Sequence, residues 1–177
     1  MRTLLFATSL TLLCGSTALA QKVGDRIVVT AAKAQLKSRA DVVGSAPEGS
    51  ILTVTVVSGD WFWVTYSGEN DVTKGWIKRL DVIPLQKALD FFNDELQRTP
   101  TAALYAIRGK IWEEKHEYDK AIADFDESIR LDPLQSTYFR RRGKVWCDKK
   151  DYDKAIADYD EAVRLGPDDA SGYAGRG

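Results

Sequence analysis

The chain has 177 residues, of which 44% are hydrophobic and 29% are charged, and its formal net charge is −1. This length suits one ordinary domain or two small ones, with enough apolar residues for a packed core. The near-zero charge excludes a global basic field directed at nucleic acid or at an anionic membrane surface.

The first twenty residues have the pattern of a secretory signal peptide. Arg2 is followed by an apolar run from Leu4 to Leu13 and by the small-residue stop Ala18-Leu19-Ala20. Cleavage is expected after Ala20, which gives a secreted or periplasmic protein beginning at Gln21. The run is about half of the ~20 apolar residues that span a membrane, so membrane contact is expected only during export.

Two alternatives to a cleaved signal remain open, a lipid anchor at Cys14 and an uncleaved anchor. Against the lipid anchor, Leu13 stands where lipoprotein signals carry Gly, Ala or Ser. If Cys14 is removed with the signal, Cys147 is the remaining cysteine and an intramolecular disulfide is excluded.

Residues 22–84 alternate β-type runs with turn residues. The alternation within 61–66 places Phe62 and Val64 on one face of a strand, and Trp61 and Trp63 on the other. Five strands are expected, at Arg26–Thr30, Gln35–Lys37, Ile51–Val57, Trp61–Tyr66 and Gly75–Lys78. Breaks are expected at 44–49, 58–60 and 67–71. Five short strands in about sixty residues favour a small closed barrel.

From Leu85 the apolar residues recur at helical spacing, and the first run ends at Pro100. The segment YDKAIADFDE at 118–127 then returns almost unchanged as YDKAIADYDE at 152–161. Helices are expected at Ala103–Glu114 and Tyr118–Leu131, and the same pair is expected one period of about 34 residues later.

One antiparallel helix pair cannot bury its apolar face alone. A solenoid buries it by stacking similar helix pairs on one another. The small Ala121 allows the paired helices to approach closely, and Phe125 lies on the same stripe and fills the space between units. Gly143 likewise lacks a side chain where the paired helices approach each other.

These residues resemble a tetratricopeptide repeat. The family pattern of an aromatic, Gly, an aromatic, Ala, an aromatic and Pro is supplied first by Tyr105, Gly109, Trp112, Ala121, Phe125 and Pro133, and then by Phe139, Gly143, Trp146, Ala155, Tyr159 and Pro167. The seventh position, usually Leu, is Arg108, Arg142 and Arg176 here. We expect these arginines to pair with Asp124 and Asp158 on the second helices.

Residues 22–84 are similar to bacterial SH3-like domains, through Leu36-Lys37-Ser38-Arg39, Val42-Val43-Gly44, Gly49, Gly59-Asp60-Trp61, Val64 and Gly75-Trp76-Ile77. The expected fold is therefore α+β in two modules, a small SH3-like β-barrel followed by an α-helical TPR solenoid, an α-α superhelix. The expected domains are a signal peptide (1–20), the barrel (22–84), the second helix of a partial repeat (85–100), two full repeats (102–135 and 136–169) and the start of a further, truncated repeat (170–177).

The resemblance implies that the first helices of the repeats line a concave groove. The groove positions include Lys110, Arg140 and Lys144, which together could bind the carboxylate of an acidic peptide or a free C-terminus. The carboxylate-binding members of the family also carry Asn at such positions, and this chain does not. The alternative is that these cations are a solvated face.

Trp61 and Trp63 form a second candidate site, since an aromatic surface on such a barrel can bind an extended peptide or a sugar-rich polymer. The alternative is that the helix at Leu85–Gln97 packs over them. A catalytic pair of His116 and Cys147 is not expected, because no third residue orients either. No metal site or cofactor is expected, since Cys and His do not cluster.

We therefore expect a non-enzymatic, secreted bacterial adaptor that binds a protein or peptide, in particular an acidic one, and no nucleic acid. The alternative is a cell-wall accessory, in which the SH3-like domain binds peptidoglycan and the repeats recruit an enzyme. A third class is an enzyme whose catalytic part lies outside this chain.

Overall fold

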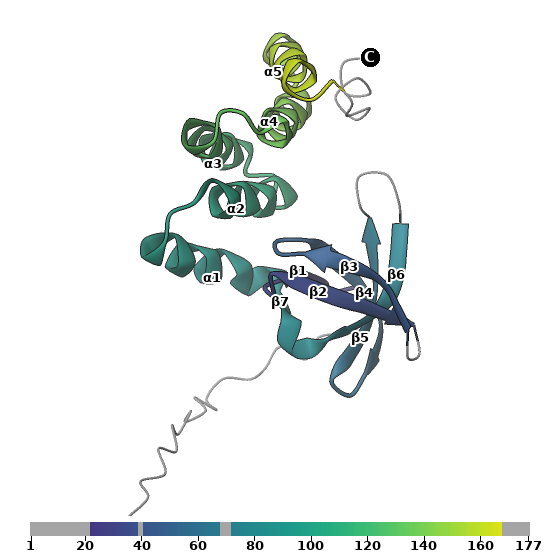
Figure 1. Cartoon of the computed structure of the whole chain (residues 1–177). Helices are drawn as coiled ribbons and strands as arrows, with labels where there is room; N and C mark the ends of the chain where they lie inside the picture. Colours follow the sequence, from purple (N-terminus) through teal and green to yellow (C-terminus); the bar gives the residue numbers. More distant parts are fainter. Residues whose placement is uncertain (1–21, 39–40, 68–71, 168–177) are drawn as a thin grey trace, which may run out of the picture.

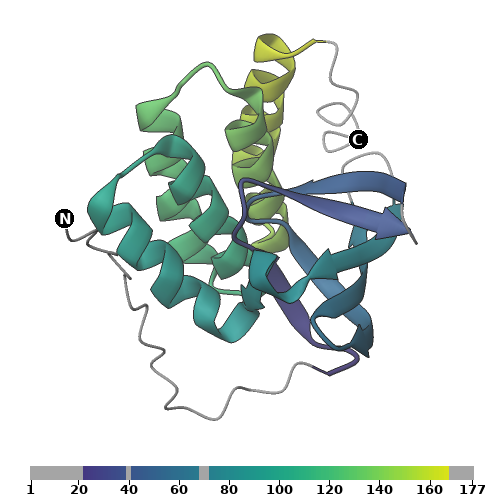
Figure 2. The ribbon, with the colours of Figure 1, turned by 60° about the horizontal axis from the view of Figure 1, so that its bottom comes forward.

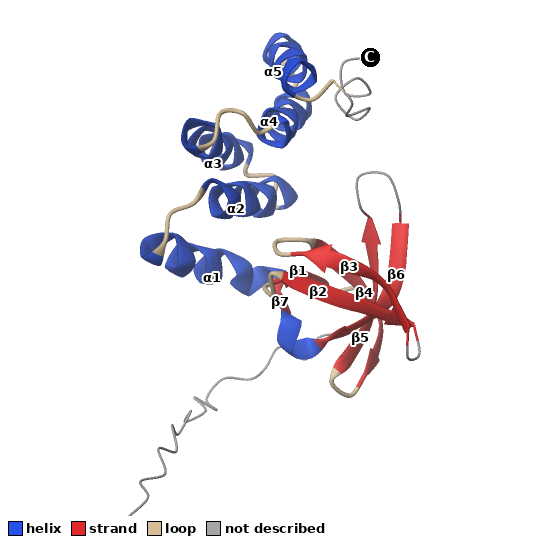
Figure 3. Ribbon diagram, viewed as in Figure 1, coloured by secondary structure: helices blue, strands red, loops and turns tan. Residues whose placement is uncertain are grey.

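The computed structural model describes residues 22–38, 41–67 and 72–167 (Figure 1). An antiparallel sheet comes first in the chain and α-helices follow it, so the structure has the expected α+β organisation (Figure 3). The signal-peptide pattern at 1–20, the start of a further repeat at 170–177 and Arg176 lie outside the described residues. In the described ranges, none of the helices is both long enough and apolar enough to cross a membrane.

All five predicted strands are present, and two further strands complete the sheet. The strands are β1 (Arg26–Val29), β2 (Lys33–Ser38), β3 (Asp41–Pro47), β4 (Ile51–Ser58), β5 (Trp61–Ser67), β6 (Val72–Lys78) and β7 (Val82–Pro84), and the 3-10 helix η1 (Arg79–Asp81) precedes β7. Their order across the sheet is β3-β2-β6-β5-β4-β1-β7.

The break predicted at 44–49 is wrong in part, because β3 runs through Gly44 to Pro47. Gly44 packs closely against β6, since a Cβ there would lie 3.0 Å from Thr73 Cγ2. Pro47 ends a strand at the edge of the sheet, where its missing N–H is tolerated.

The predicted closed barrel is also wrong, because β3 and β7 are the two edges of an open sheet. The sheet nevertheless wraps around one apolar core, to which all seven strands contribute, including Leu36, Leu52, Phe62 and Ile77. The β7 strand is only three residues long and passes into a helix at Pro84, so it offers little backbone for closure. That helix instead packs against β1 and β7.

Five helices follow the sheet in the described part of the chain: α1 (Leu85–Arg98), α2 (Ala102–Glu114), α3 (Tyr118–Leu131), α4 (Ser136–Asp148) and α5 (Tyr152–Leu165). The two helices predicted in the first full unit are confirmed, with α2 beginning one residue earlier than expected. Helix α2 begins there because the Thr101 side chain accepts a hydrogen bond from Leu104 N at 3.2 Å.

The helices form hairpins α2/α3 and α4/α5 that stack on one another (Figures 1 and 2). Small residues permit this close packing, as predicted. A Cβ on Gly109 would lie 3.1 Å from Phe125 Cζ and 3.3 Å from Ala121 O, and a Cβ on Gly143 would lie 3.3 Å from Ala155 O. The repeated sequence therefore repeats the same helix contact.

A second apolar core joins the sheet to the helices. Val28, on the outer face of β1, packs with Phe92 of α1 and with Ile107 and Ile111 of α2. Ile51 and Ile83 contact the same cluster from β4 and β7. Helix α1 thus packs on β1 and β7, and this cluster of the described residues includes neither Trp61 nor Trp63. The alternative in which α1 covers the two tryptophans is wrong.

Candidate functional site

A hollow of about 610 Å³ lies between the outer face of the sheet and helices α2 and α4. Five of its lining residues are cationic and two are carboxylates, so its charge is positive although the whole chain is close to neutral. The lining residues are Arg26, Ser50, Ile51, Thr53, Thr65, Tyr66, Ser67, Lys110, Glu113, Glu114, Arg140, Arg141 and Lys144.

The hollow exists because the β3–β4 turn is docked against α2. Gly49 lies in the left-handed region at φ +73°, and a Cβ there would come within 2.4 Å of Ile107 Cγ1. Lys110, one helical turn beyond Ile107, donates a hydrogen bond to Gly49 O at 3.2 Å. The turn therefore occupies part of the groove that the first repeat was expected to offer, and Lys110 forms the wall between the turn and the hollow.

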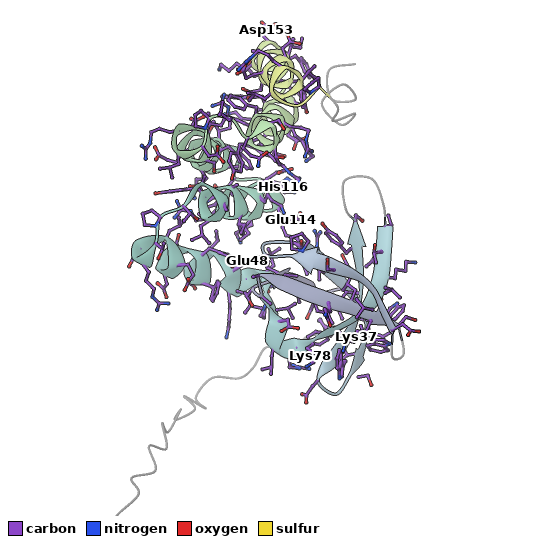
Figure 4. The ribbon with its side chains drawn as sticks, in the orientation of Figure 1. Lys37, Glu48, Lys78, Glu114, His116 and Asp153 are labelled. Carbon is purple, nitrogen blue, oxygen red and sulfur yellow. The ribbon has the colours of Figure 1, made fainter. Side chains whose placement is uncertain are left out.

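Two ion pairs hold the walls of the hollow together. Arg26 Nη1 on β1 lies 2.6 Å from Glu114 Oε1 at the end of α2, and Figure 4 shows Glu114 between that helix and the sheet. Glu113 pairs with Lys144 and so connects α2 to α4. Burial alone would lower the pKa of Lys144, but the hydrogen bond and charge of Glu113 outweigh it and raise that pKa, so the ammonium stays charged.

Arg140 and Arg141 add two guanidinium groups from α4. On the opposite wall, the buried Nε of Arg26 has no hydrogen-bond acceptor among the described residues. Thr53 and Thr65 lie in the same row of the sheet, because Arg26 pairs with Thr53 and Thr53 pairs with Thr65 across the strands. A concave surface rich in donors and cations is suited to a carboxylate-bearing ligand.

The predicted tryptophans lie on the outer face of the sheet, outside the hollow. The rings of Trp63 and Trp76 meet edge to face with centroids 5.4 Å apart. The Nζ atoms of Lys37 and Lys78 lie 5.9 and 5.7 Å from the Trp61 ring centroid, within the range of cation–π attraction. Both lysines lie at the same end of the sheet, away from the helices (Figure 4).

The structure therefore brings Lys110, Arg140 and Lys144 together in one hollow and leaves Trp61 and Trp63 outside it. Sequence reasoning missed the contribution of the sheet, in particular Arg26, Thr53 and Tyr66. Strand alternation is the one signal that could have found part of it, since Thr65 lies on the same face of β5 as Trp61 and Trp63. The sequence gives no sign that this face would dock beside α2 and α4.

His116 and Cys147 do not form a pair. The His116 ring nitrogen Nδ1 lies 3.0 Å from Tyr118 Oη, in the turn between α2 and α3. Cys147 lies instead beside Tyr159, and its thiol contributes to that residue's electrostatic environment. Within 22–38, 41–67 and 72–167, His, Cys, Asp and Glu residues form no group that could hold a metal ion.

The comparisons agree with the helical repeats. Residues 113–170 match the sequence model of the tetratricopeptide repeat family, so this region contains tetratricopeptide repeats. No curated protein sequence matches the chain.

Solved structures show the same helical fold. The chain is similar to the TPR domain of Arabidopsis OM64, with a TM-score of 0.50 and 22% identity over 52% of this chain and 77% of that one. The first TPR of Spaghetti (RPAP3), bound to the HSP90 peptide SRMEEVD, has a TM-score of 0.50 and 17% identity over 52% of this chain and 74% of that one. The second TPR domain of human RPAP3, in complex with the HSP70 peptide SGPTIEEVD, has a TM-score of 0.50 and 22% identity over 52% and 78% of the two chains.

Proposed function

We propose that this protein is a non-enzymatic adaptor, and that the hollow between its sheet and its repeats binds an acidic segment of a partner protein. The observation that carries the proposal is the concentration of Arg26, Lys110, Arg140, Arg141 and Lys144 around one concave surface. Hydrogen bonds to charged groups contribute about 1.5–3 kcal/mol each, so two or three of them would favour a carboxylate over a neutral group.

The structural neighbours support a peptide ligand. Both RPAP3 domains are described with peptides that end in EEVD, and those peptides carry several carboxylates. The likeness in fold does not carry over their ligands. In this chain the charge of the hollow, which has contributions from the sheet as well as from the repeats, supports an acidic peptide independently of those neighbours.

The test is a screen of fluorescent peptides against the full chain and an Arg140→Ala/Lys144→Ala double variant. We expect acidic peptides to bind the unchanged protein, and the double variant to lose at least tenfold in affinity. Salt should weaken binding, because partly exposed charges are screened over about 8 Å at physiological ionic strength. Equal binding of acidic peptides and of their amide counterparts (Gln and Asn for Glu and Asp, amidated C-terminus) by both proteins would contradict the charge argument.

The proposal includes the organisation and export of the chain. We assign 22–84 to an SH3-like domain, 85–100 to a partial repeat, and 102–135 and 136–169 to full repeats, in a bacterial protein that is secreted or periplasmic. The mature chain should begin at Gln21, because Ala18 and Ala20 form a small-residue cleavage site. Intact-mass measurement of the exported protein tests this start, and a mass that retains Met1 or a lipid on Cys14 would contradict it.

A second candidate function, the targeting of peptidoglycan, is favoured by the half-buried Trp61 and the two lysines beside its ring. In this alternative the sheet binds the cell wall and the repeats recruit an enzyme. Sedimentation with purified cell walls separates the two functions. The adaptor should stay in the supernatant, and a wall-targeting accessory should sediment unless Trp61 is replaced by Ala.

A further inference from the structure

The hollow continues into a basic and aromatic track across the outer face of the sheet. Strand pairing defines its successive rows. The row at the hollow is Arg26, Thr53, Thr65 and Lys74; the next is Trp63, Trp76 and Lys37; and the last is Trp61 and Lys78. Residues that pair directly across antiparallel strands share a face, so these side chains all lie opposite the core residues Phe62 and Val64.

The dimensions of the track suit an extended peptide. Thr65, Trp63 and Trp61 alternate along β5, and a strand rises about 3.3 Å per residue, so Thr65 and Trp61 lie roughly 13 Å apart. A peptide in an extended conformation covers that distance in about four residues. A segment with its acidic part in the hollow therefore reaches Trp61 with a side chain only a few positions away.

The strands that form the track carry positive charge and no negative charge. The strands β2, β4, β5 and β6 contain no Asp or Glu, although the chain has 26 acidic residues. Lys37, Lys74 and Lys78 lie on the outer face beside the tryptophans. At the far end, Asp60 and Asp81 line the small hollows beside Trp61.

We infer that the partner segment is extended and bipartite, with acidic residues held in the hollow and an apolar or aromatic side chain, two to four positions away, packed on Trp63, Trp76 or Trp61. This inference rests on the proposed function and specifies the chemistry of its ligand. The acidic part is attracted by Arg140, Arg141 and Lys144, and the apolar part gains from burial against the tryptophan rings.

The carboxylates at the far end of the track favour a peptide over a uniform polyanion. A nucleic acid or an anionic glycan would present negative charge along its whole length, including beside Asp60 and Asp81 at the far end. Trp63 and Trp76 meet at an interplanar angle of 68°, so they do not offer the parallel platforms on which successive bases stack.

The experiment compares a short acidic peptide with longer forms that carry Phe two or four residues from the acidic pair, on either side. Matched forms carry Ser in place of Phe. Affinity is measured by fluorescence anisotropy with the full chain. We expect one Phe peptide to bind about tenfold more tightly than its Ser counterpart, which corresponds to ~1.4 kcal/mol. The ratio of the two affinities should fall to about one in Trp61→Ala or in Trp63→Ala.

Two lysine double variants provide the control. Lys37→Ala/Lys78→Ala removes the cations beside Trp61, and Lys149→Ala/Lys154→Ala removes those that lie 5.6 and 4.3 Å from the Trp146 ring on the helices. Both change the net charge equally, but only the first should reduce the affinity for the extended acidic peptides, by about threefold or more at low salt.

The outcomes distinguish the inference from the proposed function. If the short acidic peptide binds and the Phe forms gain nothing over the Ser forms, the adaptor function stands and the track is refuted. Equal losses in the two lysine double variants would also refute the track. If a single-stranded oligonucleotide or a uronic-acid glycan binds more tightly than every peptide, both the bipartite peptide and the acidic-peptide function are overturned.

Discussion

Arg142 donates two parallel hydrogen bonds to Asp158, from Nε to Oδ2 at 2.9 Å and from Nη2 to Oδ1 at 2.6 Å. Arg108 makes the same pair of bonds with Asp124 in the preceding repeat. Each arginine also reaches the preceding second helix, Arg142 through Asp126 and Arg108 through Asn93. The arginine that replaces the usual Leu of the repeat therefore joins three helices. Its pairing with Asp124 and Asp158 was predicted, and its contact with the preceding second helix was not.

Arg142→Ala should lower the free energy of unfolding by about 3–5 kcal/mol, because it leaves the carboxylate of Asp158 buried without a counterion. The Asp158 side chain is only 7% exposed. Arg142→Lys should destabilise less, since it keeps the charge and loses the two-pronged geometry. Chemical denaturation followed by circular dichroism measures both.

The control for this prediction is Arg164→Ala, which removes an exposed arginine from its pair with Glu161 on α5. It should change the stability much less than Arg142→Ala, because exposed ion pairs contribute little. Similar losses in the two variants would show that burial of the Arg142–Asp158 pair has no special importance.

Gly143→Leu should destabilise the helical array by about 1–3 kcal/mol or more through overpacking. A side chain there would press on Asp158 Cβ at 3.2 Å and on Tyr159 Cε1 and Ala155 O at 3.3 Å. The control is Ala157→Leu, at an exposed position of α5. The melting curve at 222 nm should shift to lower temperature for Gly143→Leu alone, and an unshifted curve would refute the close-approach argument.

Gly49→Ala should weaken the junction between the sheet and α2 for two reasons. The left-handed conformation costs a side chain about 1–2 kcal/mol, and the new Cβ would collide with Ile107. Gly59→Ala isolates the first cost, because Gly59 is also left-handed at φ +56° and has nothing within 4 Å of the added atom. Gly49→Ala should therefore lower the unfolding free energy more than Gly59→Ala.

A double-mutant cycle completes the test of the junction. In an Ile107→Ala background the colliding atoms are gone, so Gly49→Ala should cost about as much as Gly59→Ala does in the unchanged protein. If Gly49→Ala costs the same with and without the Ile107 side chain, the contact between the β3–β4 turn and α2 does not contribute to stability.

The helices could be predicted closely because their signals are local and repeated. The apolar spacing in YDKAIADFDE and the breaks around His116 and Pro133 define α3 almost to the residue. The Arg–Asp pairs could be predicted for the same reason, since both partners recur at the fixed spacing of the repeat. The edge strand β3 could not, because Gly44 and Pro47 are turn residues by composition and only the neighbouring strand makes them part of a sheet.

Some residues of the candidate site could be predicted from the sequence, but the way in which the fold brings them together could not. Lys110, Arg140 and Lys144 follow from the groove positions of the repeats, and Trp61 and Trp63 follow from alternation along one strand. The relation between the two sets depends on contacts between residues far apart in the chain, such as Lys110 with Gly49, 61 positions away. No local pattern specifies that contact, so the sheet wall of the hollow could be found only in the structure.

Alkaline pH should destabilise the folded chain through Tyr159, the buried tyrosine of the hairpin α4/α5. Burial, and then the neighbouring Cys147, raise the pKa of Tyr159 from 10.0 to about 12. The unfolded chain releases the phenol proton near pH 10, whereas the folded chain keeps it until the pH approaches 12. The stability that the neutral phenol provides is therefore complete below about pH 10 and is lost as the pH rises through about 12.

Tyr159→Phe removes the titrating group and keeps the ring, so it separates this effect from the titration of lysines. Urea unfolding of both proteins at several values between about pH 9 and pH 12 gives the comparison. The unfolding free energy of the unchanged protein should fall more steeply than that of the variant between about pH 10 and pH 12. Parallel curves would mean that Tyr159 ionises at the same pH in the folded and unfolded chains, and that the contact of α5 with α4 leaves its phenol accessible to water.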